Sequence, residues 1–202
     1  LNSGESCDSP QRMLVPHARM AEAMAIAKKA AESYVVGDPN DPKTTLGPLI
    51  SKAHWEKVQG LIKMGIEDGA TVVTGGLGRP EGLNRGYFAR PTIFGNVTPA
   101  MRIANLEIFG MTMMIIGYAD EDEAVRIAND TEYGLAGYVQ SSDIERARKV
   151  ARRLRVGAVQ INYPAFDPYS AFGGYKQSGN GREYGAFGLH DYLETKCLIG
   201  YK

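Results

Sequence analysis

The feature that most constrains the fold is an alternation of short apolar runs with longer helical segments along most of the 202 residues. Runs with the length and composition of strands lie at 11–15, 70–76, 87–97, 111–118, 135–141 and 156–162. Segments with helical composition or spacing lie at 17–34, 52–69, 120–134 and 143–155. Repeated strand–helix units of this size predict an α/β fold with an open, mostly parallel sheet and helices on both faces.

Local signals refine several of these elements. Ser51 is a suitable N-cap for the helix that follows it, and Gly69 is a plausible stop. The run 111–118 is almost wholly apolar, which is typical of a strand covered on both faces. Pro91 lies inside the run 87–97, which predicts that this strand lies near an edge of the sheet.

Composition excludes several classes of partner. Acidic and basic residues number 23 each, so nothing indicates a nucleic acid or an anionic membrane surface as a ligand. No apolar run approaches the roughly 20 residues of a membrane-spanning helix. The two cysteines, Cys7 and Cys197, form neither a disulfide framework nor a metal-ligand motif, so we expect no metal site and a reducing, cytoplasmic location.

Five stretches, in order, carry a resemblance to a known family. They are NSGESC at 2–7, VGDPNDPKTTLGPLIS at 36–51, LEIFG at 106–110, NDTEYGLAGYVQS at 129–141 and FGGYKQSGNGREYGAFGL at 172–189. Together they resemble the C-terminal, catalytic portion of NAD(P)-dependent aldehyde dehydrogenases, and the resemblance covers essentially the whole chain. It implies the α/β catalytic domain of that family and oxidation of an aldehyde to a carboxylic acid with NAD or NADP.

The resemblance identifies Cys7 as the nucleophile. A cysteine thiolate adds to the aldehyde carbonyl, and the family stabilises the resulting oxyanion with the backbone N–H of this cysteine and an asparagine side chain. Hydride transfer to the nicotinamide and hydrolysis of a thioester complete the reaction. Without the family context, a lone cysteine is more often a small packing residue, and that remains the expectation for Cys197.

The same resemblance implies roles for five other residues. Glu107 and Phe109 match residues that contact the nicotinamide ribose and ring, and Lys57 matches a position that can contact the adenine-side ribose. An exposed carboxylate, a core aromatic and an exposed helix lysine are the alternative roles. Asn162 and Phe172 match positions that line the substrate tunnel, with a purely structural role equally open for Phe172. The three histidines, His17, His54 and His190, match no catalytic pattern and are expected at the surface or partly buried.

The resemblance also bears on organisation and partners. The family's general-base glutamate, its oxyanion asparagine and its glycine-rich dinucleotide segment precede the cysteine, so we expect this chain to need a missing N-terminal, cofactor-binding half and to form a homo-oligomer when complete. One catalytic domain is expected over 1–188, with a tail strand over 189–202 that pairs with another element or subunit. Cys7 is expected at the carboxyl edge of the sheet.

The chain departs from the family pattern at four positions. Glu5 stands in place of glutamine, Leu106 in place of glutamate, and Met111 and Ala171 in place of prolines. These departures keep open a second hypothesis, in which the domain retains the fold but acts as a non-catalytic interaction module.

Overall fold

The computed structural model describes residues 2–200 and confirms the α/β prediction. The chain divides into two compact units, the first ending at Asp130 and the second beginning at Thr131. The boundary falls inside the segment 1–188 for which one domain is expected, so a single catalytic domain remains a prediction. Within residues 2–200, no helix is both long and apolar enough to cross a membrane.

The first unit is built on a four-stranded sheet in the order β1-β4-β3-β2. Strands β1, β4 and β3 are parallel, and β2 is antiparallel to β3. The strands are β1 (Arg12–Pro16), β2 (Thr71–Thr74), β3 (Thr92–Val97) and β4 (Thr112–Tyr118). The helices are α1 (Met20–Glu32), α2 (Lys52–Glu67) and α3 (Glu121–Asn129), with short 3₁₀ turns η1 (Asn2–Gly4), η2 (His17–Arg19) and η3 (Arg102–Asn105).

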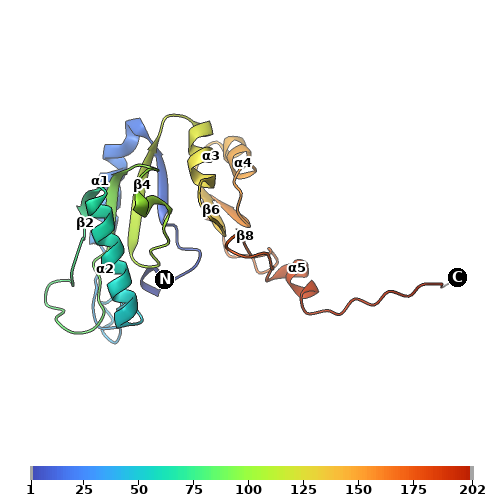
Figure 1. Ribbon diagram of the computed structural model, residues 1–202, viewed down its shortest axis with the longest axis horizontal. Helices are drawn as coiled ribbons and strands as arrows, with labels where there is room; N and C mark the ends of the chain where they lie inside the picture. The colour runs from blue at the N-terminus through green and yellow to red at the C-terminus, as the bar shows by residue number, and fades with distance from the viewer. Residues whose placement is uncertain (1, 201–202) are drawn as a thin grey trace. The chain divides into compact units, whose positions relative to one another are not determined.

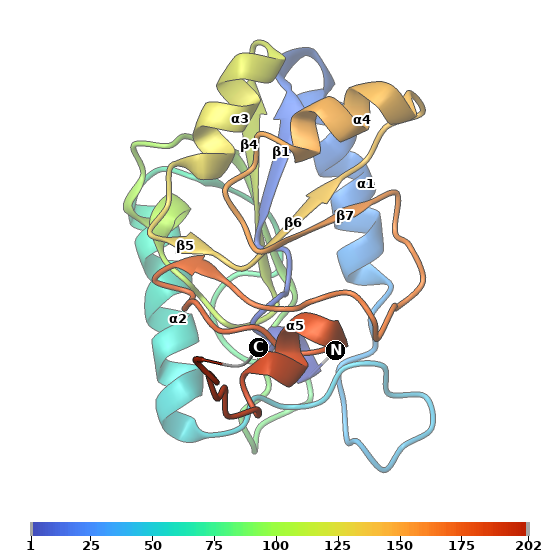
Figure 2. The same cartoon turned by 90° about the vertical axis from the view of Figure 1, so that its right-hand side faces the viewer.

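Helices cover both faces of this sheet, as Figure 2 shows for α1 and α2. Successive strand residues point to opposite faces, so Ile115 packs with α1 while Met114 and Ile116 pack with α2, η3 and α3. Phe94 on β3 and Ile62 on α2 are both fully buried in the core that contains Met114 and Ile116. The expectation that the run 111–118 is covered on both faces is therefore confirmed.

The termini of α2 follow the sequence signals. The Ser51 hydroxyl accepts a hydrogen bond from the His54 N–H at 3.2 Å, which satisfies one of the free donors of the first turn. After Asp68, Gly69 adopts a φ of +86°, a left-handed conformation that ends the helix and that glycine reaches without strain.

The expectation that the strand containing Pro91 lies near an edge is wrong. Strand β3 is an interior strand, with β4 on one side and β2 on the other. Pairing starts after the proline, because the first bonded residue is Thr92, whose N–H donates to the Met111 carbonyl at 2.8 Å. Pro91 removes a donor that neither ladder uses, so it places no restriction on where the strand lies.

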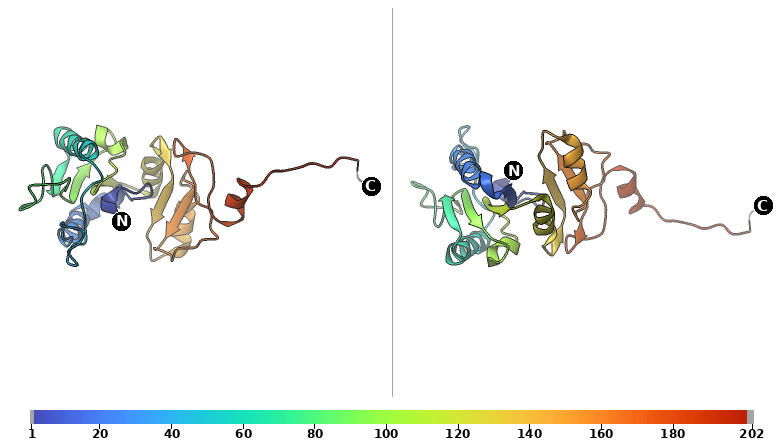
Figure 3. Two further views of the ribbon diagram at one scale, coloured as in Figure 1. Left: turned by 90° about the horizontal axis from the view of Figure 1, so that it is seen from below. Right: turned by 90° about the horizontal axis from the view of Figure 1, so that it is seen from above.

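The second unit contains two small sheets. Strands β6 (Ala136–Val139) and β7 (Ala158–Ile161) are parallel, and α4 (Ile144–Ala151) connects them and packs on them, as Figures 1 and 3 show. Strands β5 (Tyr133–Gly134) and β8 (Tyr175–Lys176) form a short antiparallel pair. Helix α5 (Gly185–His190) is the last regular element in the described part of the chain.

Residues 191–200 contain no strand. Their apolar side chains, including Leu198 and Ile199, are exposed. Residues 201–202 of the expected tail strand lie outside the described residues. Pairing of this tail with another subunit therefore remains a prediction.

Candidate functional site

Cys7 lies on an exposed turn that precedes β1. The Ser9 N–H donates to the Ser6 carbonyl at 3.1 Å, and the Ser6 hydroxyl donates to the Asp8 carboxylate at 2.6 Å, so the turn is closed on both sides of the cysteine. The side chain of Cys7 is exposed and its thiol is free. In this chain Cys7 is thus not the buried packing residue that a lone cysteine would otherwise suggest.

Gly4 brings the Cys7 turn against the segment that carries Glu107 and Phe109. A Cβ atom added to Gly4 would lie 2.4 Å from the carbonyl carbon of Gly110 and 2.8 Å from the nitrogen of Met111. Only a residue without a side chain allows the two backbones to approach this closely. The φ of +79° at Gly4 adds a second reason for glycine here.

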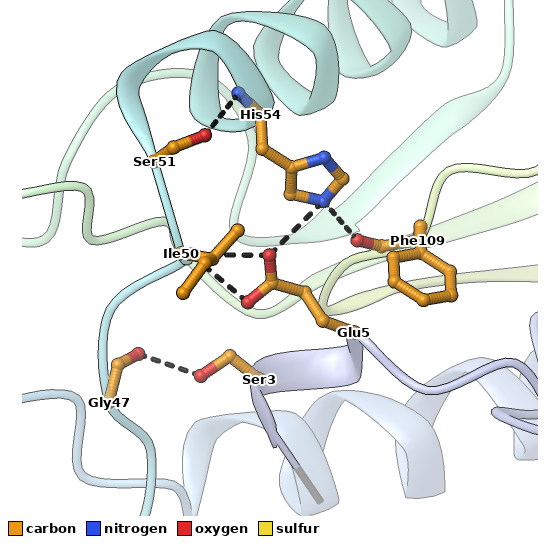
Figure 4. Close-up of polar contacts among 7 residues, drawn as sticks. All are labelled: Ser3, Glu5, Gly47, Ile50, Ser51, His54 and Phe109. Carbon is orange, nitrogen blue, oxygen red and sulfur yellow. Dashed lines mark hydrogen bonds and ion pairs between the residues drawn. The ribbon is translucent and has the colours of Figure 1, made fainter.

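Glu5 and His54 connect the segments around Gly4 and Phe109 to the start of α2, as Figure 4 shows. The Ile50 N–H donates to both carboxylate oxygens of Glu5, at 3.1 and 3.2 Å. His54 Nε2 lies 2.6 Å from the Phe109 carbonyl oxygen and 3.4 Å from a Glu5 oxygen. Because both neighbours are acceptors, Nε2 carries the proton. Glu5 also places its negative charge at the positive end of the α2 dipole.

Ser3 and Gln11 add two further connections on either side of Cys7. The Ser3 hydroxyl donates to the Gly47 carbonyl at 2.9 Å, in the loop before α2. The Gln11 amide bonds to the backbone on both sides of Glu107. The segments 2–11, 47–54 and 106–111 are therefore one connected structure, although they are far apart in the sequence.

This structure lies at the amino ends of the parallel strands, so the prediction of the carboxyl edge is wrong. Cys7 precedes β1, and Phe109 precedes β4. Since β1 and β4 are parallel, segments that lead into them meet at the same, amino-terminal edge. The family motifs indicate which segments contain the candidate residues. They do not indicate whether each segment precedes or follows a strand.

The three residues expected to contact the cofactor all lie in the first unit. Glu107 is exposed, and Phe109 is half-buried with a φ of +58°, which is uncommon for a residue with a bulky side chain. The Phe109 ring packs edge-on against the His54 ring, with centroids 5.9 Å apart. Lys57 is exposed on α2, one turn beyond His54. The geometry thus brings Glu107 and Phe109 beside the Cys7 turn, with Lys57 on the adjoining helix.

Asn162 and Phe172 belong to the second unit. The Asn162 amide donates to the Ser141 carbonyl at 2.8 Å and accepts from the Ser141 N–H at 3.0 Å, which joins the ends of β6 and β7. Phe172 is half-buried, and its backbone exchanges two hydrogen bonds with Glu183 at 2.7 and 2.8 Å. Their role in a substrate tunnel remains a prediction.

Sequence reasoning missed the role of His54 and Gln11. His54 was expected to be a surface or partly buried histidine, and its side chain is 16% exposed, but its contacts with Glu5 and Phe109 could not be foreseen. The sequence contained one indication of these contacts. His54 is the third residue of α2, so its side chain lies in the first turn of the helix, close to the helix N-terminus. Gln11 belongs to none of the sequence motifs. Its hydrogen bonds go to backbone atoms 95 and 97 residues away, and contacts at such a separation leave no local sequence pattern.

Comparison with known proteins decides the family. The model of the aldehyde dehydrogenase family matches residues 1–198. The chain belongs to the aldehyde dehydrogenase family. This agrees with the motifs at 2–7 and 106–110.

Individual relatives support the assignment. A 3-succinoylsemialdehyde-pyridine dehydrogenase from a Pseudomonas species is 52% identical over 202 residues, which are 100% of this chain and 42% of that protein. The crystal structure of a cysteine-to-alanine mutant of aldehyde dehydrogenase C from Pseudomonas syringae, complexed with NAD⁺ and octanal, matches with a TM-score of 0.97 and 50% identity over 99% of this chain and 41% of that one. An aldehyde dehydrogenase from Mycobacterium tuberculosis complexed with NAD⁺ matches with a TM-score of 0.94 and 44% identity over 100% of this chain and 42% of that one. The chain thus spans about 42% of the length of the curated relatives that it matches.

Proposed function

We propose that this chain is the cysteine-bearing, C-terminal catalytic portion of an NAD(P)-dependent aldehyde dehydrogenase, with Cys7 as its nucleophile. The observation that carries the proposal is the direct packing of the Cys7 turn, through Gly4, on the segment that contains Glu107 and Phe109. Nucleophile and cofactor contacts must lie side by side if a hydride is to leave the carbon that is bonded to sulfur.

Cys7 is suited to attack because its thiol is free and exposed. Its thiolate adds to the carbonyl carbon of an aldehyde and forms a thiohemiacetal whose oxygen carries the negative charge. The backbone N–H of Cys7 is one donor for that oxygen in the family's mechanism. Loss of the hydride from carbon leaves a thioester on Cys7, and water then releases the carboxylic acid and restores the thiolate.

Glu107 and Phe109 fit the nicotinamide end of NAD or NADP. Glu107 presents an exposed carboxylate, an acceptor that two ribose hydroxyls can satisfy, and the half-buried ring of Phe109 offers an apolar surface. The cofactor supplies the hydride acceptor when it is bound. Lys57 would contact the adenine-side ribose, and Asn162 and Phe172 would line the substrate tunnel, as the family resemblance implies.

The remaining parts of the site are proposed to come from the rest of a longer protein. The coverage of about 42% of the relatives' length leaves room for the family's general-base glutamate, oxyanion asparagine and glycine-rich dinucleotide segment. These would form an N-terminal, cofactor-binding half that precedes this chain, in a cytoplasmic homo-oligomer. By itself this chain should therefore be inactive.

Steady-state assays on three proteins test the proposal. The isolated chain should not oxidise aldehydes with NAD⁺ or NADP⁺, whereas a longer protein in which the family's upstream segment precedes this chain should do so. Cys7→Ala in the longer protein should lower kcat by at least about 10³-fold, because the covalent route is lost. Cys197→Ala is the matched control and should retain activity.

Either of two results would refute the mechanism: robust oxidation by the isolated chain, or undiminished oxidation by the longer Cys7→Ala protein. An inactive longer protein with intact Cys7 would favour the non-catalytic interaction module instead.

A further inference from the structure

We propose that Gln11 is a positioning residue that holds Glu107 in place for the ribose of the cofactor. The inference rests on the proposed function of Glu107 and adds a residue to which neither the motifs nor the relatives assign a role. It also makes one short segment, 7–11, responsible both for the nucleophile and for the placement of a cofactor contact.

The Gln11 side chain bonds to the backbone on both sides of Glu107. Its amide nitrogen donates to the Leu106 carbonyl at 2.6 Å, and its amide oxygen accepts from the Ile108 N–H at 2.8 Å. The donor and acceptor of a primary amide match this carbonyl and N–H in one orientation only. The amide therefore acts as a short strand partner for residues 106–108 and fixes the backbone from which the Glu107 side chain projects.

Gln11 is itself held firmly. Its backbone carbonyl accepts from the Met114 N–H at 2.8 Å, which places it at the start of the β1–β4 ladder. By contrast, the segment it bonds to lies between η3 and β4, and the Leu106 N–H makes only a long bond of 3.4 Å to the Ile103 carbonyl. Ile108 anchors one end of this segment in the core, whereas Leu106 and Glu107 are exposed. The two hydrogen bonds of the Gln11 amide thus hold the exposed end of this segment, which has few other contacts of its own backbone.

A fixed carboxylate matters because small displacements of a positioning group reduce rates and affinities strongly. A carboxylate that must be ordered on binding costs side-chain and backbone entropy, and this cost appears as weaker cofactor binding. Gln11 removes part of that cost in advance. It should act on cofactor affinity through Glu107 and leave the aldehyde KM nearly unchanged.

The test uses the longer protein that contains this chain, titrated with NAD⁺ or with NADP⁺ if only that cofactor binds. Gln11→Met keeps the length of the side chain and removes both hydrogen bonds; Gln11→Glu keeps the acceptor for Ile108 and loses the donor for Leu106. We expect the cofactor Kd to rise about tenfold in Gln11→Met and at least as much in Gln11→Glu, in which a carboxylate oxygen would face the Leu106 carbonyl, one acceptor against another. In a Glu107→Ala background, Gln11→Met should produce no further rise, because the group that it positions is absent.

Gln59→Met is the matched control. The Gln59 amide also bonds to a distant backbone atom of this unit, accepting from the Gly78 N–H at 2.6 Å, whereas the Gln11 amide bonds to Leu106 and Ile108. The midpoint of thermal unfolding of the Gln59→Met protein should fall below that of the wild type, whereas its cofactor Kd should not change. Retention of the wild-type Kd in Gln11→Met, or an equal rise with and without Glu107, would overturn the positioning role while leaving the proposed function intact. Absence of cofactor binding and turnover in the wild-type protein would instead refute the proposed function, and this inference with it.

Discussion

Gly4 is the residue on which the close approach of the segments 2–11 and 106–111 depends. Gly4→Ala would force a Cβ into the Gly110 carbonyl group and impose a left-handed φ of +79° on alanine. We expect the change to lower the free energy of unfolding by at least about 1–2 kcal/mol, since the obstacle is backbone rather than a flexible side chain. Urea unfolding of the isolated chain measures it.

Gly60 provides the control for this change. It lies in the middle of α2, and an added Cβ would meet nothing within 4 Å. Gly60→Ala should therefore raise the free energy of unfolding by about 0.5–1 kcal/mol, because alanine has the higher helix propensity. Equal effects of the two changes would show that the Gly4 contact is not tight.

At the level of single residues, the sequence names candidate residues but not the contacts that they make. The motif at 2–7 was sufficient to single out Cys7, and the motif at 106–110 singled out Glu107 and Phe109. The bond between His54 and the Phe109 carbonyl was not predictable, because it joins residues 55 positions apart and leaves no local pattern. The same applies to Glu5, whose carboxylate accepts from the Ile50 N–H just before α2.

Among the elements, α2 and η3 are joined by a carboxylate whose titration can be followed. Asp68, which follows α2, accepts from Arg102 Nε at 2.6 Å and from the Ile103 N–H at 3.2 Å. Burial by itself raises the pKa of Asp68, but the hydrogen bonds and the Arg102 charge outweigh it, so the net effect is a lowered pKa. The ionised form is thus the one that stabilises the fold.

Stability should therefore decline as Asp68 gains a proton. A lowered folded-state pKa gives a contribution that is complete above the ordinary carboxylate pKa of about 3.9 and is lost as pH falls through the folded value. The difference in unfolding free energy between wild type and Asp68→Asn should be constant from about pH 7 to about pH 5 and should shrink below about pH 4. Urea titrations across this range measure it. Parallel pH profiles for the two proteins would contradict the assignment, and Arg102→Met should weaken the dependence.

Element types were predictable where the local signal and the tertiary environment agreed. The Ser51 cap and the doubly covered strand β4 are examples, since capping and apolar patterning are local properties. The interior position of β3 and the amino-terminal location of the site were not, because both depend on the order of strands in the sheet. Pro91 was misleading for the same reason: its effect depends on whether its missing N–H falls inside a ladder.

On the scale of the whole molecule, apolar exposure is concentrated in the second unit. Exposed aromatic and aliphatic side chains follow β7 through to the tail: Tyr163, Phe166, Tyr169, Tyr175, Tyr184, Phe187, Leu189, Tyr192, Leu193, Leu198 and Ile199. An accumulation of this kind is typical of surfaces that other polypeptide covers. The sequence indicated this apolar exposure only through the many aromatics and glycines of the segment 163–188. The division of the chain after Asp130 corresponds to no sequence feature.

The isolated chain should consequently self-associate. Sedimentation velocity should show a weight-average mass that rises with protein concentration, because contact between copies removes apolar surface from water. The double change Leu198→Ser and Ile199→Ser should reduce this rise, since these side chains are 79% and 93% exposed and make up the apolar end of the tail. Ile26→Ser, which removes an exposed apolar side chain from α1 in the first unit, should leave the rise as it is. A monomer at every concentration, or an equal reduction by Ile26→Ser, would show that the apolar tail does not drive association.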